Sequence, residues 1–276
     1  MLPYFRSMEA FFDLSLSKSW ADLSDPQLLF FFRQLATDKP MAEIQTLCLC
    51  QWANVLVRYR LYGSVYLVQH GKQQATLTLH QFVCAITALD FLKSFSPYPI
   101  RIMTFGKARA IAADFQGVPF STFISTYYYQ GFLHTKNEAL LNHLATLLYP
   151  KVKSRHLTPP LLLNAFYWFS SLKQYLARLF PHFLQPMSSS SEDLLGYAPP
   201  IGEVLRTAMN AQIRALTGGD ITKEEAVLLM DTWRALTEFD AKAKHQTTNE
   251  MTKGQLILLD EEGHPSLFAP IMIASL

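Results

Sequence analysis

The sequence predicts a mainly α-helical protein, in which a multi-helix globular body with one minor β-hairpin is followed by a C-terminal helical hairpin. Apolar residues recur at helical spacing along most of the chain, and Ser or Thr followed three residues later by Glu or Gln precedes several of these runs. A chain of 276 residues that is 50% hydrophobic can bury a large core. The Ser- and Pro-rich stretch at 186–200 predicts a linker between a body (1–185) and a helical hairpin (201–246), with a C-terminal arm at 247–276.

The first two helices of the body have clear boundaries in the sequence. Ser24 or Asp25 followed by Pro26 predicts the start of a helix, because these are preferred N-cap and first-turn residues. Asp38 to Pro40 ends it. A second helix is then expected from about Met41 to Val57.

Between Leu61 and Thr78 the apolar pattern changes and predicts a short β-hairpin that turns near Gly71. Thr78 then pairs with Gln81 in a capping box, which predicts a new helix that reaches Leu92. This hairpin is the clearest β signal in the chain.

The middle of the chain predicts three further helices. One covers Lys107 to Asp114, and the next begins at Phe120 and ends at Gly131. Thr135 and Glu138 form the capping box of the third, which carries an apolar stripe of leucines.

The stretch from Leu161 to Phe180 tests whether the chain could cross a membrane. Polar residues interrupt it before the roughly 20 apolar residues that a spanning helix needs; they are Asn164, Lys173, Gln174 and Arg178. Thr158 and the two prolines after it predict a helix start, and Pro181 predicts its end. We therefore expect a core helix, and no membrane.

The helical hairpin near the C-terminus is the most explicitly punctuated part of the sequence. Its first helix should end at Gly218 and Gly219, since glycine favours the left-handed conformation that terminates helices. Thr222 and Glu225 form the capping box of the second helix, which should run to about His245. The arm after it holds two apolar runs around an acidic turn; we favour packing against the same chain, with docking on another subunit as the alternative.

Charge and motifs exclude several function classes. The 24 basic and 22 acidic residues nearly balance, so no long-range field favours nucleic acid or an anionic membrane. Dinucleotide, nucleotide, zinc-protease, hydrolase and paired-CxxC motifs do not occur, so we expect no enzyme and no cofactor. Three cysteines and a first segment unlike a secretion signal indicate a reducing, cytoplasmic compartment. Cys48 and Cys50 would point about 200° apart on a helix, so a metal site is not expected and both are interpreted as core residues.

An enzyme with an unrecognised acid–base site is the alternative. His134, Glu138 and His143 are its candidate residues, and Asp90 and Asp114 are a second candidate pair. Such residues more often only cap or solvate the ends of helices.

Aromatic residues indicate a protein partner or self-association. The run Tyr127 to Tyr129 has no Arg or Lys beside it, which favours an interface or a core over nucleic acid. The candidate interface residues are Tyr127, Tyr128, Tyr129, Phe132, Trp168, Trp233, Phe239, Ile271 and Ile273.

Two stretches, Phe115 to Tyr149 and Met209 to Lys244, resemble helical proteins encoded among the tail and head genes of bacteriophages and prophages. The resemblance implies a role in virion assembly, as a structural component or a tail assembly chaperone, in the host cytoplasm or the virion. It brings no catalytic residues. The chain departs from an extended scaffold because no long charged helix is expected after Lys244.

Overall fold

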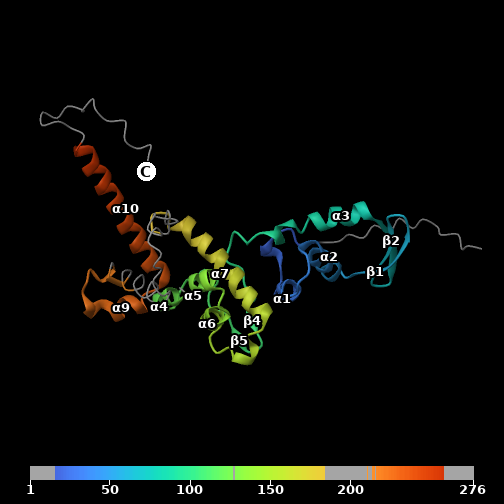
Figure 1. The fold of residues 1–276 in the computed structure, drawn as a ribbon, viewed down its shortest axis with the longest axis horizontal. Coiled ribbons are helices and arrows are strands. Elements are labelled where there is room, and N and C mark those ends of the chain that lie inside the picture. Colours follow the sequence, from blue (N-terminus) through green and yellow to red (C-terminus); the bar gives the residue numbers. More distant parts are fainter. Residues whose placement is uncertain (1–15, 127, 184–209, 211–212, 215, 258–276) are drawn as a thin grey trace, which may run out of the picture. The chain divides into compact units, whose positions relative to one another are not determined.

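The computed structural model describes residues 16–126, 128–183, 210, 213–214 and 216–257. Within them the chain is mainly helical, with one three-stranded and one two-stranded antiparallel sheet (Figure 1). The prediction of a mainly α-helical protein is therefore confirmed. The predicted hairpin forms two strands of the three-stranded sheet, and the two-stranded sheet was not predicted.

The chain folds into two compact units. The first unit comprises Met1–Gln116 and Thr122–Tyr175, and the second comprises Gly117–Ser121 and Leu176–Leu276. The short segment 117–121 thus belongs with residues far from it in the sequence.

Helix α1 (Asp25–Leu35) opens the first unit and begins where the sequence predicts. The backbone N–H and the hydroxyl of Ser24 both donate to Oε1 of Gln27, at 2.9 Å each. This capping box satisfies N-terminal groups that the helix itself leaves without partners.

Helix α2 (Met41–Trp52) ends earlier than predicted. Asn54 adopts a left-handed backbone (φ 51°), and strand β1 (Val55–Tyr62) begins immediately after it. The prediction of helix up to Val57 was wrong because the apolar spacing of Val55 to Val57 does not by itself separate a helical stripe from a strand.

A three-stranded antiparallel sheet replaces the predicted hairpin. Strands β2 (Val65–His70) and β3 (Gln73–Thr78) form that hairpin, and β1 adds a third strand at the edge in the order β1-β2-β3. The two turns contain Gly63 and Gly71, both with positive φ.

Helix α3 (Leu79–Thr87) follows the sheet and has the predicted Thr78–Gln81 capping box. It is shorter than expected, because a 3-10 turn at Asp90–Lys93 replaces its last turn.

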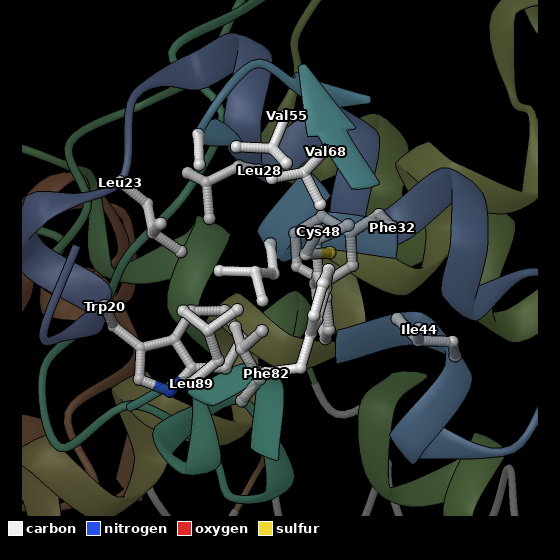
Figure 2. Close-up of a cluster of buried hydrophobic side chains, with 14 of the residues drawn as sticks. Trp20, Leu23, Leu28, Phe32, Ile44, Cys48, Val55, Val68, Phe82 and Leu89 are labelled. Atoms are coloured by element: carbon white, nitrogen blue, oxygen red, sulfur yellow. The ribbon is translucent and has the colours of Figure 1, made fainter. Parts of the chain in front are cut away.

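The core of the first unit forms where these elements meet. Figure 2 shows its side chains pointing toward one another from the first helices, the sheet and α3. The labelled members of the cluster are Trp20, Leu23, Leu28, Phe32, Ile44, Cys48, Val55, Val68, Phe82 and Leu89.

The segment predicted as a helix from Lys107 to Asp114 is not helical. It begins with strand β5 (Ala108–Arg109), which pairs with the preceding β4 (Thr104–Phe105) across a turn at Gly106, where φ is 62°. This prediction was wrong because the helix preference of the alanines is weak, and the pairing of β5 with β4 across the glycine turn outweighs it.

Three short helices then follow, with boundaries that differ from the prediction: α4 (Phe120–Ser125), α5 (Tyr128–Thr135) and α6 (Glu138–Leu148). Gly131 lies buried inside α5 and does not end a helix. Asn137, not Thr135, caps α6, because its side-chain oxygen accepts the N–H of Ala139 at 3.0 Å.

Helix α7 (Pro159–Leu179) is the predicted core helix. The carbonyl of Thr158 accepts from the N–H groups of Leu161 and Leu162, so the helix begins at the predicted place. No helix in the described part of the chain is long and apolar enough to cross a membrane.

In the second unit, Gly218 and Gly219 have the predicted left-handed conformation. Asp220 then caps a 3-10 turn at Ile221–Lys223 by accepting the N–H of Thr222. The capping box predicted for Thr222 and Glu225 is therefore wrong, since a residue better placed for the cap precedes it.

The helix predicted from Thr222 to His245 is two helices. Helix α9 (Glu224–Leu229) ends at Met230, whose ψ of 148° is extended, and α10 (Thr232–Ile257) follows. Helix α10 was expected to end at about His245, and it instead continues to Ile257.

Residues 117–120 fill the break between α9 and α10. The N–H of Phe120 donates to the carbonyl of Met230 (2.8 Å), and the N–H and hydroxyl of Thr232 donate to the carbonyl of Val118 (2.9 and 2.7 Å). The N–H of Gly117 donates to the carboxylate of Asp231 at 2.6 Å. These bonds satisfy backbone groups that the break would otherwise leave without partners.

The linker predicted at 186–200, most of the first helix of the C-terminal hairpin, and residues 258–276 of the arm lie outside the described residues.

Candidate interaction surface

One face of the three-stranded sheet packs on the core. Val68 is fully buried, and it pairs with Val57 of β1 on one side and with Ala75 of β3 on the other. Side chains directly opposite each other in an antiparallel pair share a face. These residues therefore define the inner face, and Figure 2 shows Val68 directed into the cluster with Val55.

The outer face of the sheet carries exposed apolar side chains on β1 and half-buried ones on β2. Leu56, Tyr59 and Tyr62 of β1 are 51%, 59% and 74% exposed. Their partners in β2, in the same order, are Gln69, Leu67 and Val65. We call Leu56, Tyr59, Tyr62, Val65 and Leu67 the outer patch.

Two irregularities in β1 bring the outer patch together. The register shifts between Val57 and Tyr59 and again between Arg60 and Tyr62, so each shift places an extra residue in the edge strand. An extra residue reverses the alternation of faces, so Tyr59 and Tyr62 share a face although they are three positions apart. The sequence did not reveal this surface, because residues up to Val57 were expected to be helical and because simple alternation assigns Tyr59 and Tyr62 to opposite faces.

Arg58 lies in the first register shift of β1, beside the outer patch, whereas Arg60 pairs with Tyr66 and so belongs to the inner face. Nε of Arg58 donates to Oε1 of Gln69 at 2.7 Å, and Nε of Arg60 donates to the carbonyl of Gly63. Residues 44–89 contain Arg58, Arg60 and Lys72 and no Asp or Glu. The chain is nearly neutral overall, but this part of it carries only positive formal charge.

Three of the predicted interface residues are core residues. Trp168 is fully buried in α7, and its Nε1 donates to the carbonyl of Ala113 at 2.7 Å. Tyr129 is buried with its hydroxyl 2.7 Å from Oγ of Ser170, and Phe239 is buried in the second unit. Because their surfaces are covered within the chain, we assign these three residues to the core.

The remaining predicted interface residues are partly exposed or not described. Tyr128 stacks on His143 with ring centroids 5.0 Å apart, and Phe132 packs edge-on against Phe166 at 5.8 Å. Trp233 packs against Phe180 in the second unit. Tyr127, Ile271 and Ile273 lie outside the described residues.

The candidate acid–base residues are not gathered into a site. His134, Glu138 and His143 are all exposed, and no hydrogen bond or ion pair joins them in the described part of the chain. Asp90 instead accepts from Nε2 of Gln45 at 3.0 Å and pairs with Lys93. The carboxylate of Asp114 accepts the N–H of Gln116, as in a local turn.

Comparison of the chain with protein-family models, with curated proteins and with solved structures finds no match in any of the three. Among the described residues, no group of three or more His, Cys, Asp or Glu side chains is placed to hold a metal ion.

The cysteines differ strongly in accessibility, which gives a direct check of the fold. Cys48 is fully buried and burial raises the pKa of its thiol to about 12, whereas Cys84 is exposed with Sγ 3.6 Å from Nε2 of His80. Since the thiolate is the reactive form, we expect a disulfide reagent at pH 8 to modify Cys84 at least about a hundredfold faster than Cys48.

The measurement is reagent uptake by the native chain, with Cys84→Ser and Cys48→Ala variants to assign the phases. In denaturant all three thiols should react rapidly. Fast reaction of Cys48 in the native chain would contradict the placement of α2 in the core.

Proposed function

We propose that the protein is a non-enzymatic protein-interaction or assembly protein, and that the outer patch contacts its protein partner. The observation that carries the proposal is the exposure of Leu56, Tyr59 and Tyr62 on one face of an edge strand. Contiguous exposed apolar side chains of this kind are typical of association sites, whereas single exposed apolar residues are common on any surface.

The composition of the outer patch favours a protein over a nucleic acid. Tyr and Arg are both enriched at the centres of protein interfaces. A base-stacking sheet also presents aromatic rings, but here aliphatic Leu56, Val65 and Leu67 share the face with them. These aliphatic side chains gain most from contact with other apolar side chains.

The resemblance of Phe115 to Tyr149 and Met209 to Lys244 to phage-encoded proteins supports a place in virion assembly. Such proteins are particle components or tail assembly chaperones, and either role requires a surface that binds protein. In this proposal the chain acts in the host cytoplasm or in the virion.

The proposal is tested on the full chain by sedimentation velocity over a range of concentrations. We expect the chain to associate, and we expect the triple variant Leu56→Thr/Tyr59→Thr/Tyr62→Thr to associate at least about tenfold more weakly. Threonine keeps the preference for strand while it removes most of the apolar surface.

The matched control is Ile221→Thr/Leu229→Thr, which removes two exposed apolar side chains, 82% and 67% exposed, from the second unit. This variant should associate like the unchanged chain. Equal association of the triple variant and the unchanged chain, with native circular dichroism, would overturn the proposal. Binding of a labelled single-stranded oligonucleotide that the triple variant loses would assign the face to nucleic acid instead.

A further inference from the structure

We propose that His80 and Cys84 on α3 form one half of a zinc site, and that a second copy of the chain supplies the other half. The inference goes beyond the proposed function, because it concerns α3 and not the outer patch. It follows from the spacing of the two side chains, from the distance between their donor atoms, and from the face of α3 on which they lie.

The two side chains have the spacing of metal ligands on a helix. His80 and Cys84 are four residues apart in α3, so they lie one above the other on the same side of it. Both are exposed. Imidazole nitrogen and thiolate sulfur are preferred ligands of Zn²⁺.

The distance between the donor atoms fits a single zinc ion. Sγ of Cys84 lies 3.6 Å from Nε2 of His80. Zinc binds sulfur at about 2.3 Å and imidazole nitrogen at about 2.0–2.1 Å in a tetrahedral arrangement, which places two such donors about 3.6 Å apart. The ion can therefore bind both side chains as they stand. The thiol gives its proton to solvent as the S–Zn bond forms, and the neutral imidazole binds through the lone pair of Nε2.

The pair is incomplete as a structural zinc site, because such a site has four protein ligands. Among the described residues, no group of three or more His, Cys, Asp or Glu is placed to hold a metal ion. Residues 44–89, which include the three-stranded sheet and α3, contain no Asp or Glu. A second copy related by a two-fold axis brings an identical His and Cys to the ion. The completed set of two cysteines and two histidines is typical of structural zinc.

The surrounding face of α3 suits contact between two copies. Successive residues of a helix are about 100° apart, so the exposed residues form one continuous arc of about 140°. They are Leu79, Val83, Thr87, His80 and Cys84. Leu79 and Val83 are 47% and 48% exposed beside the two ligands, whereas Phe82 is buried in the core of the unit. Two such faces can cover their apolar side chains while the four ligands meet at the ion.

The experiment measures self-association of the full, untagged chain by sedimentation velocity, with zinc chloride or with a chelator, in a reducing agent that does not bind metal. Zinc should strengthen association at least about tenfold, with one ion bound per two chains. His80→Ala and Cys84→Ser should each remove this increase. Cys84→His should restore most of it, since a second imidazole at the same spacing also binds zinc.

The matched control is His134→Ala, which removes an exposed histidine of the same unit and should keep the full zinc response. Since both ligands are exposed, all of these variants should keep native circular dichroism. Zinc bound at one ion per chain without a change in association would overturn the shared site. An equal zinc response in Cys84→Ser and in the unchanged chain would overturn the ligands themselves.

Cobalt(II) gives a spectroscopic test of the same site, because it accepts the same ligands and absorbs strongly in the near ultraviolet when thiolate is bound. This absorption should saturate at one ion per two chains and should be absent from Cys84→Ser. Zinc should also slow the reaction of Cys84 with a disulfide reagent at least about tenfold, and this protection should be lost in His80→Ala. An unprotected Cys84 in the presence of saturating zinc would contradict the proposal.

The outer patch and the zinc site fail in different experiments. The triple variant Leu56→Thr/Tyr59→Thr/Tyr62→Thr should lose the association seen in chelator and retain the zinc-dependent increase. If it associates like the unchanged chain in chelator, the proposed function fails and the zinc site stands. Loss of the zinc-dependent increase in this variant would overturn the placement of the shared site on α3.

Discussion

Replacement of Asn164 by alanine is expected to lower the free energy of unfolding of the first unit by about 3 kcal/mol, since it leaves buried polar groups without partners. Asn164 is fully buried in α7, and its side-chain oxygen accepts the N–H of Ile102 at 3.0 Å. Its amide donates to the hydroxyl of Tyr149 at 2.7 Å, and that hydroxyl donates to the carbonyl of Ile102 at 2.6 Å. The three groups thus satisfy one another directly.

This network fixes an otherwise irregular segment to the helices. Ile102 lies in the chain between the 3-10 turn at Asp90–Lys93 and β4, where no long helix or strand supplies backbone partners. A buried N–H or carbonyl without a partner costs about 1–3 kcal/mol. Loss of the Asn164 side chain removes the acceptor of the Ile102 N–H and the donor to the Tyr149 hydroxyl at the same time.

The measurement is chemical denaturation followed by circular dichroism. The control variant is Asn142→Ala, because Asn142 also lies in a helix but its side chain is only partly buried. The control should change stability by less than about 0.5 kcal/mol. Tyr149→Phe combined with Asn164→Ala should show a coupling of at least about 1 kcal/mol, as expected for directly bonded partners. Additive effects, or a loss below about 1 kcal/mol for Asn164→Ala, would contradict the network.

The helix starts that were predicted correctly are fixed by hydrogen bonds between residues only three positions apart in the sequence. Ser24 with Gln27 and Thr78 with Gln81 form their capping boxes inside one turn, so the sequence contains the whole interaction. The same pattern at Thr135 and Glu138 failed because Thr135 is the last residue of α5, which left the cap to Asn137.

The features that could not be predicted depend on distant contacts. The break between α9 and α10 is stabilised by residues 117–120, more than a hundred positions earlier, which no local pattern reveals. The outer patch depends on two shifts in the pairing of β1 with β2, and register is a property of two strands together. The sequence did contain one usable signal, the β-branched and aromatic composition of Val55 to Tyr62, which favours a strand over a continued helix.

Trp20 is a further core residue that no sequence pattern identified, and Trp20→Ala is expected to lower the free energy of unfolding by about 4 kcal/mol. The residue precedes α1, in a single 3-10 turn, yet its side chain is only 5% exposed. Its ring packs edge-on against Phe31 and Phe91, with centroids 5.4 and 5.8 Å apart. Its Nε1 donates to the carbonyls of Phe91 and Ser94.

Trp20→Phe separates the two contributions of this side chain. Phenylalanine keeps an aromatic ring among Phe31 and Phe91 but loses the N–H, so we expect a loss of about 1–2 kcal/mol, well below that of alanine. Both variants are measured by guanidinium denaturation with circular dichroism as the readout. If both variants lose the same free energy of unfolding, the stabilisation comes from the hydrogen bonds. A loss below about 1.5 kcal/mol for Trp20→Ala would contradict the placement of Trp20 in the core. We expect the alanine variant to be much less stable than the phenylalanine variant. The reason is that burial and edge-to-face packing of the ring contribute more to stability than the two hydrogen bonds of Nε1.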